Sequence, residues 1–538
     1  MAYTPSLDPI LYTAANGSVD QALMDLMRTQ GQSPVGTRTN LPRVTLVVGP
    51  SPFTMPRGWE FFLTSPYEGI TYIATVLTNA GYPVRIVDVR YDRTPLETAY
   101  RQVMEGTDVV GIATFEDNYP FVEDLIRELK NARPKLPILL GGSLVTSVPH
   151  VFMNDTRADV AVISEGELTI LEVMEAYSQD RWAERLPQIK GIWYKDAAGV
   201  VHTNPPRGQM PNLDSLPNMR LDLWPQSKEA RGLQPQIITS YSRGCKMDCS
   251  FCYRTTPQER VKSPAKLHAE LTWLKEQYQI DFAFFVDLTF TAHKKQTLAY
   301  LEVIKEFDIG WTCLTRNADV DLEVTTAMGE AGCDIALYGV ESLTPQVLKE
   351  ARKGSTEHIV LKAMKNTWDA GVRYGGLTIV GLPGETEESL DHMCQWAEDN
   401  QHITRVKYLS AMPGTTVYKQ GLATGTIRSE AEHLRWLSVE QALERDEYLN
   451  YNNLPDHVMR RAYKRLYDSY QPGPVMDFHH YPEHFEYFDP EPTTEWRAEF
   501  SSAAAVPDPG TLKYRGLKPS SSGVTLTRVR PGEFTVQV

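Results

Sequence analysis

The sequence has no excess of positive charge and no apolar run long enough to cross a membrane. Its 538 residues include 54 lysines and arginines against 68 aspartates and glutamates, a formal net charge of −14. A nucleic-acid-binding protein is expected to show a basic surface, so this balance argues against that class. A membrane-spanning helix needs about 20 consecutive apolar residues, and neither such a run nor a basic-then-apolar leader is present. We therefore expect a cytoplasmic protein that binds neither nucleic acid nor membrane.

Cysteine is scarce, with six residues in the whole chain. Three of the six fall within eight residues. Cys245, Cys249 and Cys252 follow a β-prone run that ends at Arg243-Gly244, with C-x3-C-x2-C spacing. Three thiolates on one loop are suited to three irons of a [4Fe–4S] cluster. A structural zinc site usually takes four protein ligands, and no nearby Cys or His pair completes one. Disulfides are disfavoured because nothing indicates secretion.

The remaining cysteines and the histidines offer no second metal site. Cys313, Cys333 and Cys394 stand in apolar strand or helix patterns, where a thiol packs as a small hydrophobe. The twelve histidines show no metal-ligand spacing.

Short apolar runs alternate with helical patterns in the first part of the chain. The runs are residues 44–48, 84–89, 109–113, 137–140 and 160–163. This alternation predicts a doubly wound parallel sheet, which binds ligands beyond the carboxyl ends of its strands. Those ends carry Gly49, Gly141-Gly142 and Glu165-Gly166. No G-x-G-x-x-G is present, so a nicotinamide cofactor is not indicated, and a ligand-free sheet with ordinary turn glycines is the alternative.

A second series of about six strand–helix units begins at Ile237 and predicts an incomplete (β/α) barrel. Functional residues of a barrel sit at the carboxyl ends of its strands. Here those ends carry Asp287, Arg316, Glu341-Ser342 and Gly381, the last in a Gly-Leu-Pro-Gly-Glu turn. For each of these residues taken alone, a salt bridge or turn at the barrel end is the alternative.

The cysteine loop, with Phe251 just before its third cysteine, resembles the cluster loop of the radical S-adenosylmethionine (radical SAM) superfamily. In that superfamily the amino and carboxylate groups of SAM chelate the open iron. Reductive cleavage then gives methionine and a 5′-deoxyadenosyl radical, with the electron from an external donor such as flavodoxin or ferredoxin.

The strand ends match the same superfamily. The resemblance implies that Asp287 lies near the SAM amino group, Arg316 toward the SAM carboxylate and Glu341-Ser342 near the ribose. Gly381 matches the family's glycine-proline turn. Such a set is chemically sensible, because a zwitterionic amino acid needs an anion and a cation nearby.

Residues 42–180 resemble the cobalamin-binding domain of cobalamin-dependent radical SAM enzymes. The matching stretches, in order, include 66–70 with Tyr67 and Glu68, 140–142 with Gly141 and Gly142, and 164–167 with Glu165 and Gly166. No D-x-H-x-x-G is present, so no histidine is offered to cobalt, and the resemblance implies a base-off cofactor. The loop around Tyr67 and Glu68 is our candidate for the lower side of the corrin, with simple loop packing as the alternative.

Together these patterns predict an α/β chain with an N-terminal doubly wound parallel-sheet cobalamin-binding domain, a partial (β/α)6 radical SAM barrel and a helical C-terminal cap. The predicted division is an arm at 1–40, the cobalamin-binding domain at 41–185, a linker at 186–232, the barrel at 233–428, a helical and aromatic cap at 429–500 and a mobile tail with a terminal hairpin at 501–538. Within the linker, the turn at 196–199 predicts a further hairpin.

The resemblance implies a methyltransferase. One SAM molecule methylates cobalamin, a second is cleaved at the cluster, and the substrate radical takes the methyl group from methylcobalamin. We expect a small-molecule or peptide substrate with an unactivated carbon, in natural-product biosynthesis. The alternatives are a cobalamin-dependent radical SAM cyclase or rearrangement enzyme, and a non-catalytic iron–sulfur or cobalamin carrier or sensor. A methylthiotransferase is disfavoured, because residues 1–244 contain no cysteine for a second cluster.

Overall fold

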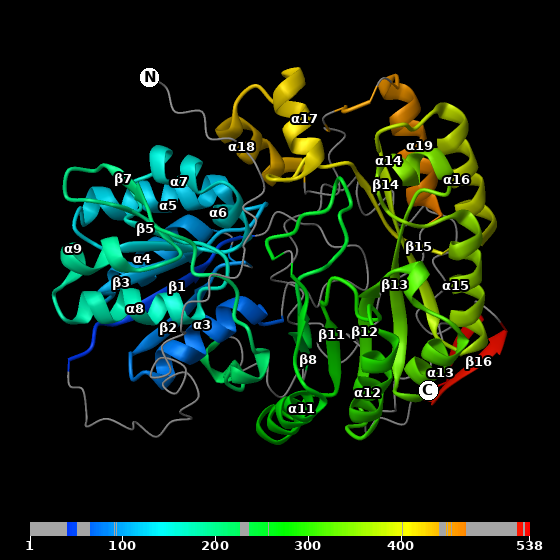
Figure 1. Cartoon of the computed structure of the whole chain (residues 1–538), viewed down its shortest axis with the longest axis horizontal. Coiled ribbons are helices and arrows are strands. Elements are labelled where there is room, and N and C mark those ends of the chain that lie inside the picture. Colours follow the sequence, from blue (N-terminus) through cyan, green and yellow to red (C-terminus); the bar gives the residue numbers. More distant parts are fainter. Residues whose placement is uncertain are drawn as a thin grey trace.

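Two sheets built mainly of parallel strands lie side by side, the first coloured blue to cyan and the second green to yellow (Figure 1). The computed structural model describes residues 40–50, 65–90, 92, 94–225, 236–256, 258–400, 402–440, 448, 450–452, 454–469, 525–530 and 533–537. The predicted arm, the aromatic part of the cap after residue 469 and most of the tail lie outside the described residues.

The first sheet has the order β2-β1-β3-β4-β5-β6-β7. Its parallel strands are β1 (Val44–Val48), β2 (Val84–Asp88), β3 (Val109–Ala113), β4 (Ile138–Gly141) and β5 (Val160–Val162). Every residue of β1 is buried, as expected for a strand covered on both faces. The order 2-1-3-4-5 is a doubly wound arrangement whose strand order reverses between β1 and β3. The predicted doubly wound sheet is confirmed.

Helices cover both faces of this sheet. On one face, α3 (Glu68–Asn79) packs beside α8 (Glu167–Ser178). On the other, α4 (Pro95–Met104) packs beside α5 (Tyr119–Ala132). Shorter helices follow the later strands and are α6 (Ser143–Ser147), α7 (Pro149–Asp155) and α9 (Trp182–Arg185).

The predicted linker hairpin is present, and it extends the first sheet. Strand β6 (Ile192–Lys195) pairs antiparallel with β5, and β7 (Val201–Thr203) pairs antiparallel with β6. Residues 192–203, which the sequence-based division assigned to the linker, therefore belong to the sheet of the first domain. The correction follows from backbone pairing, since β5 would otherwise be an open edge.

The second sheet has six parallel strands in the order β15-β14-β13-β12-β11-β8. They are β8 (Gln236–Thr239), β11 (Phe282–Phe285), β12 (Gly310–Thr315), β13 (Cys333–Glu341), β14 (Arg373–Val380) and β15 (Ile403–Tyr408). The intervening helices are α11 (Pro264–Tyr278), α12 (Lys294–Lys305), α13 (Leu322–Glu330), α14 (Pro345–Glu350), α15 (Glu357–Asp369) and α16 (Glu387–Asn400). This is the predicted partial barrel, with sequential strands adjacent.

The two cap helices pack on different domains. Helix α18 (Glu430–Glu440), after α17 (Thr416–Thr424), buries Leu434 and Leu437 in a core of the first domain. Helix α19 (Asp456–Asp468) instead packs against α16 and β15. The side chains of Leu434 and Leu437 on α18 and of Leu466 on α19 are buried. The cap therefore contacts both domains, and β16 (Thr525–Arg530) with β17 (Glu533–Gln537) forms an antiparallel hairpin.

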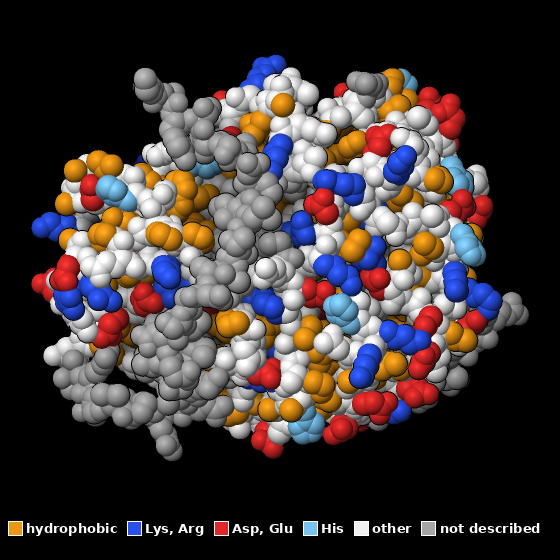
Figure 2. Space-filling model, in the orientation of Figure 1, with side chains coloured by type: hydrophobic (Ala, Val, Ile, Leu, Met, Phe, Trp, Pro, Cys, Tyr) orange, Lys and Arg blue, Asp and Glu red, His pale blue; other side chains and the backbone are white. Residues whose placement is uncertain are grey.

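The visible surface carries charges of both signs, interspersed over both domains (Figure 2). Among the residues that the structure describes, no helix combines the length and apolar character that a membrane crossing requires.

Candidate active site

The three clustered cysteines lie on a loop that a short antiparallel ribbon closes at its base. Strand β9 (Ser242–Arg243) pairs with β10 (Arg260–Val261), with Arg243 opposite Arg260. Gly244 follows β9 with φ of 88°, and a Cβ there would collide with the backbone oxygen of Gln258. Only glycine therefore suits this position, which explains why Arg-Gly precedes the first cysteine.

The thiols of Cys245, Cys249 and Cys252 are free and partly buried. Burial raises the pKa of Cys249, and it raises the pKa of Cys252 to about 12. No three His, Cys, Asp or Glu side chains of the described residues converge on one metal ion. A [4Fe–4S] cluster does not require this, because each cysteine binds a different iron. Three thiols on one loop thus fit the predicted cluster.

The cysteine loop rests on four consecutive residues after α14, which we call the support segment (351–354). Ser250 N donates to Ala351 O at 3.0 Å, and Cys249 Sγ lies 3.7 Å from Arg352 O. Arg352 also pairs with Asp248 at 2.8 Å. The support segment therefore fixes the backbone of the cysteine loop through contacts with residues 248–250.

An ion pair joins the support segment to the end of β13. Lys353 Nζ lies 2.8 Å from Glu341 Oε1, and each side chain is 10% exposed. Lys353 Nζ is also 5.9 Å from the centre of the Phe251 ring, on the cysteine loop. Glu341 has a φ of 61°, a left-handed conformation that costs about 1–3 kcal/mol for a non-glycine residue and is typical of functional sites.

Sequence reasoning found Glu341 and missed Lys353. The available signal was Arg352-Lys353-Gly354, two cations before a glycine in a stretch without apolar periodicity. The structure also brings predicted Arg316 here, where its Nη2 donates to Lys353 O at 3.1 Å and its Nη1 pairs with Asp319 at 3.2 Å. Predicted Ser342 accepts from the backbone N–H of Thr344 at 3.3 Å and shapes a turn. Contacts of Arg316 and Ser342 with SAM stay predictions.

Asp287 holds the strand that enters the cysteine loop. It is 1% exposed, and its Oδ1 accepts from Ser242 N at 2.6 Å and Ser242 Oγ at 2.5 Å. Burial raises the pKa of Asp287 to about 7, although the hydrogen bonds from Ser242 lower it. The predicted contact of Asp287 with the SAM amino group stays a prediction.

Gly381 forms the turn between β14 and α16. Its N–H donates to Glu385 Oε2 at 2.6 Å, its φ is 100°, and a Cβ would lie 2.7 Å from Met459 Cε on α19. The turn is therefore fixed by Glu385 and packed against the cap, while its proximity to SAM stays a prediction.

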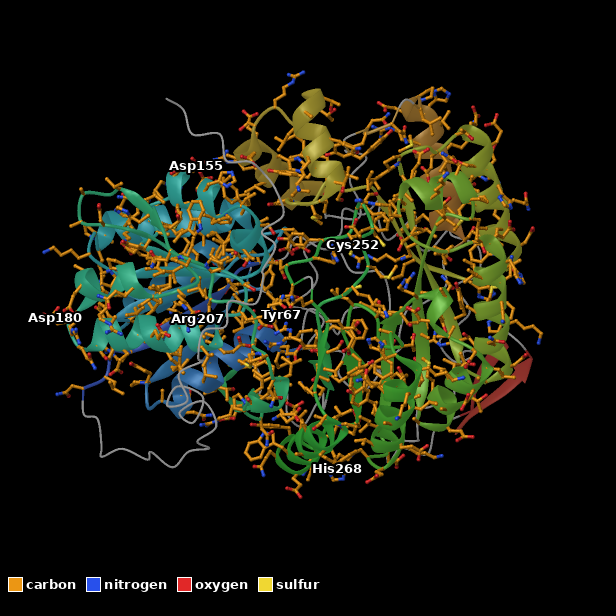
Figure 3. All side chains as sticks on the ribbon, viewed as in Figure 1. Tyr67, Asp155, Asp180, Arg207, Cys252 and His268 are labelled. Carbon is orange, nitrogen blue, oxygen red and sulfur yellow. The ribbon has the colours of Figure 1, made fainter. Side chains whose placement is uncertain are left out.

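On the first domain, Tyr67 lies beside the end of β3, near the point where the strand order reverses. Its ring packs edge-on against Phe115 at 5.3 Å, and the guanidinium of Arg90 lies 4.3 Å above it. Burial raises the pKa of Tyr67 to about 12. Figure 3 shows Tyr67 and Cys252 in the central region between the two sheets.

The two glycines at the end of β4 differ in their surroundings. Gly142 has φ of 118°, and a Cβ there would collide with the backbone oxygen of Thr114. A Cβ on Gly141 would meet no atom of the described residues within 4 Å, so the backbone here has room for a ligand. Helix α6, which follows these glycines, contacts the cysteine loop, because Ser147 Oγ lies 3.2 Å from the hydroxyl of Tyr253, which follows Cys252.

The predicted acids of the first domain contact the barrel. Glu68 accepts from Ser240 Oγ at 2.8 Å, and Glu165 pairs with Arg243 and Arg260. Gly166 packs tightly, with a Cβ position 3.1 Å from Ile73 Cδ1. Contacts of Glu68, Glu165 and Gly166 with cobalamin stay predictions.

Comparison with known families finds a match for each of the two domains. Residues 239–397 match the Radical SAM superfamily model, and residues 64–174 match the B12 binding domain model. The chain belongs to the cobalamin-dependent radical SAM family. These two domains support a [4Fe–4S] cluster, SAM and cobalamin as its cofactors.

Several curated relatives are similar to this chain over about two thirds of its length. An uncharacterized methyltransferase of Pyrococcus horikoshii is 29% identical over 372 residues, which cover 68% of this chain and 80% of the relative. An anaerobic magnesium-protoporphyrin IX monomethyl ester cyclase of Rubrivivax gelatinosus is 26% identical over 348 residues, 62% of each chain. The match thus spans less than two thirds of the cyclase.

Two solved structures show the same fold. The cobalamin-dependent radical SAM enzyme OxsB, with aqua-cobalamin and SAM bound, has a TM-score of 0.56 at 18% identity, covering 74% of this chain and 56% of OxsB. The radical SAM methyltransferase TsrM of Kitasatospora setae, with cobalamin and a [4Fe–4S] cluster bound, has a TM-score of 0.58 at 18% identity, covering 71% of this chain and 78% of TsrM.

Proposed function

We propose that this chain transfers a methyl group from SAM, by way of cobalamin, to an unactivated carbon of a small-molecule or peptide substrate in natural-product biosynthesis. The observation that carries the proposal is the contact between Ser147 and Tyr253, 3.2 Å apart. It joins the last residue of α6, the short helix that follows β4 and the predicted cobalamin-binding glycines, to the residue that follows the third cysteine. Both cofactors would then share one region, as a reaction that uses them in succession requires. Relatives named methyltransferases support the proposal.

The protein groups have distinct tasks in this proposal. When bound, the cluster, SAM and cobalamin supply the radical chemistry and carry the methyl group. Cys245, Cys249 and Cys252 hold three irons. Lys353 would offer its ammonium to the SAM carboxylate, a role that the family resemblance gives to neighbouring Arg316, and Glu341 would orient Lys353 through their 2.8 Å contact. Arg316 positions the support segment through Lys353 O.

Tyr67 faces the lower side of the corrin in this proposal. Together with Phe115 it would present an aromatic surface to the corrin, with no nitrogen ligand for cobalt. Gly141, at the end of β4, would let the corrin approach the backbone. An external one-electron donor such as flavodoxin or ferredoxin would reduce the cluster.

The test is the fate of SAM carrying a deuterated methyl group. Anaerobic protein loaded with cluster and cobalamin is incubated with candidate substrates and a reductant. The proposal expects labelled product together with S-adenosylhomocysteine and 5′-deoxyadenosine in equal amounts. Absence of label from every product, with 5′-deoxyadenosine still formed, would contradict methyl transfer. No SAM-derived product under any condition would favour a carrier or sensor.

A second candidate is ring formation or rearrangement, because two relatives are named anaerobic magnesium-protoporphyrin IX monomethyl ester cyclases. The same assay separates it. A cyclase yields 5′-deoxyadenosine and an oxidised or rearranged product without label from the SAM methyl group.

A further inference from the structure

Glu165 is bound from two sides by the ribbon that closes the cysteine loop. Its Oε1 lies 2.7 Å from Arg260 Nη2 and 3.3 Å from Arg243 Nη1, and its Oε2 lies 2.8 Å from Arg260 Nη1. Arg243 and Arg260 are paired opposite each other in β9 and β10. One carboxylate of the first domain therefore holds both strands through which the chain enters and leaves the cysteine loop.

The contact is enclosed by protein. The side chains of Glu165, Arg260 and Arg243 are 9%, 12% and 15% exposed. Arg243 also pairs with Glu167 at 2.7 Å, at the start of α8. Burial alone would raise the pKa of Glu165, but the hydrogen bond from Arg260 and the charge of Arg243 lower it overall. Oε2 also accepts from Met210 N at 2.6 Å, and Arg260 Nη1 donates to Met210 O at 2.7 Å, so the carboxylate binds both the ribbon and the connector at Met210.

A second group of buried contacts joins the same two regions independently. Ser240, shortly before the ribbon, donates to Glu68 at the start of α3. Lys262, directly after the ribbon, is 1% exposed and donates to Ser240 O at 2.7 Å, Glu270 at 2.8 Å and Tyr72 OH at 3.2 Å. The first domain therefore holds the chain just before and just after the ribbon as well.

We propose that Glu165 is a positioning residue, which fixes the cysteine loop against the first domain rather than contacting the corrin. This rests on the proposed function, because it gives the first domain a second task beside cofactor binding. In this proposal the cobalamin domain stays in a fixed position against the barrel. The separation between cluster and cobalt is then set by the contacts of Glu165, Arg243 and Arg260.

The test compares Glu165→Gln with the parent chain, both purified anaerobically as the full protein. Cobalamin affinity and the visible spectrum of bound cobalamin report on the corrin. The EPR spectrum of the reduced cluster, with and without SAM, reports on the cysteine loop, and magnetic coupling between the reduced cluster and cob(II)alamin reports on their separation. Glu172→Gln is the matched control, because Glu172 lies on α8 and pairs with Arg207 at 2.7 Å.

The proposal expects Glu165→Gln to keep cobalamin affinity within about twofold while changing the SAM-dependent cluster spectrum and the coupling. Arg260→Gln, which leaves the first domain intact, is expected to give the same changes. Glu172→Gln is expected to match the parent in all readouts. Cobalamin binding weakened tenfold or more with a parental cluster spectrum would overturn the proposal, as would parental behaviour of both Glu165→Gln and Arg260→Gln.

The failure of the proposed function is a separate result. A parent chain that binds no cobalamin would show it directly. The cluster spectra of Glu165→Gln and Arg260→Gln would still decide the positioning role, because they need only iron, sulfide and SAM. If Glu165→Gln does not fold, Arg260→Gln alone decides. Loss of cobalamin with an unchanged cluster spectrum in Arg260→Gln would contradict the positioning role of Glu165.

Discussion

Lys353 Nζ lies 2.8 Å from Glu341 Oε1, beside the loop that carries the three cysteines. The pair links a strained strand end, with φ of 61° at Glu341, to the support segment under that loop. A buried cation with a fixed partner is pre-organised for an anionic ligand group. This is why we assign the SAM carboxylate to Lys353.

Replacing Lys353 by Met is expected to weaken SAM binding. Loss of a charge-assisted hydrogen bond costs about 1.5–3 kcal/mol, so the dissociation constant should rise roughly ten- to hundredfold. Lys353→Arg should retain part of the affinity. Equilibrium binding of SAM to the anaerobic protein measures both. Lys362→Met, which removes an exposed lysine from α15, is the control, and equal losses in both Met variants would refute the assignment.

Alanine in place of each of the two glycines at the end of β4 is expected to give different results. Gly142→Ala should destabilise the cofactor-free protein, because its Cβ would collide with the backbone of Thr114 at φ of 118°. Gly141→Ala should leave that stability unchanged, because its Cβ meets nothing within 4 Å, and should still weaken cobalamin binding. Thermal unfolding of the apo protein and cobalamin titration check the pair. Full cobalamin affinity in Gly141→Ala would place the corrin elsewhere.

Breaking the ion pair between Asp334 and Arg373 is expected to destabilise the barrel strongly. The side chains are 0% and 6% exposed, and the pair is 2.7 Å long. Removing one partner leaves a buried charge, which costs about 3–5 kcal/mol, so Asp334→Asn should lower the denaturation midpoint clearly. Asp369→Asn, which removes the partner of exposed Lys365, should cost under about 1 kcal/mol. Similar midpoints for both variants would contradict the burial argument.

Glu385 is expected to make stability depend on pH. Burial raises its pKa to about 8 from an ordinary value of 4.5, outweighing the hydrogen bonds from Gly381 and Leu382. The folded state therefore binds the proton more tightly, and the stabilisation is complete below pH 4.5 and lost as pH rises toward 8. The melting temperature of the parent should fall more between pH 5 and 8.5 than that of Glu385→Gln. Glu388→Gln should follow the parent, because the pKa of Glu388 is lowered by backbone hydrogen bonding, and a parental slope in Glu385→Gln would refute the assignment.

The sequence predicted features that local spacing determines. The cysteine loop and the two alternating series follow from patterns within a few tens of residues, and Glu341 ends a recognisable strand. Contacts between distant segments left no local signal. Glu165 and Arg260 are 95 residues apart, and Glu68 and Ser240 are 172 apart. An acid at a strand end looks the same whether it faces a ligand or another domain, so these pairings required the structure.

The most direct test of the central claim is the cofactor content of the full chain. The protein is purified anaerobically after expression with cobalamin, and iron, sulfide and bound cobalamin are quantified with a visible spectrum. We predict about four irons and about one base-off cobalamin per chain. Four irons without cobalamin would contradict methyl transfer by way of cobalamin and leave a cobalamin-free radical SAM reaction.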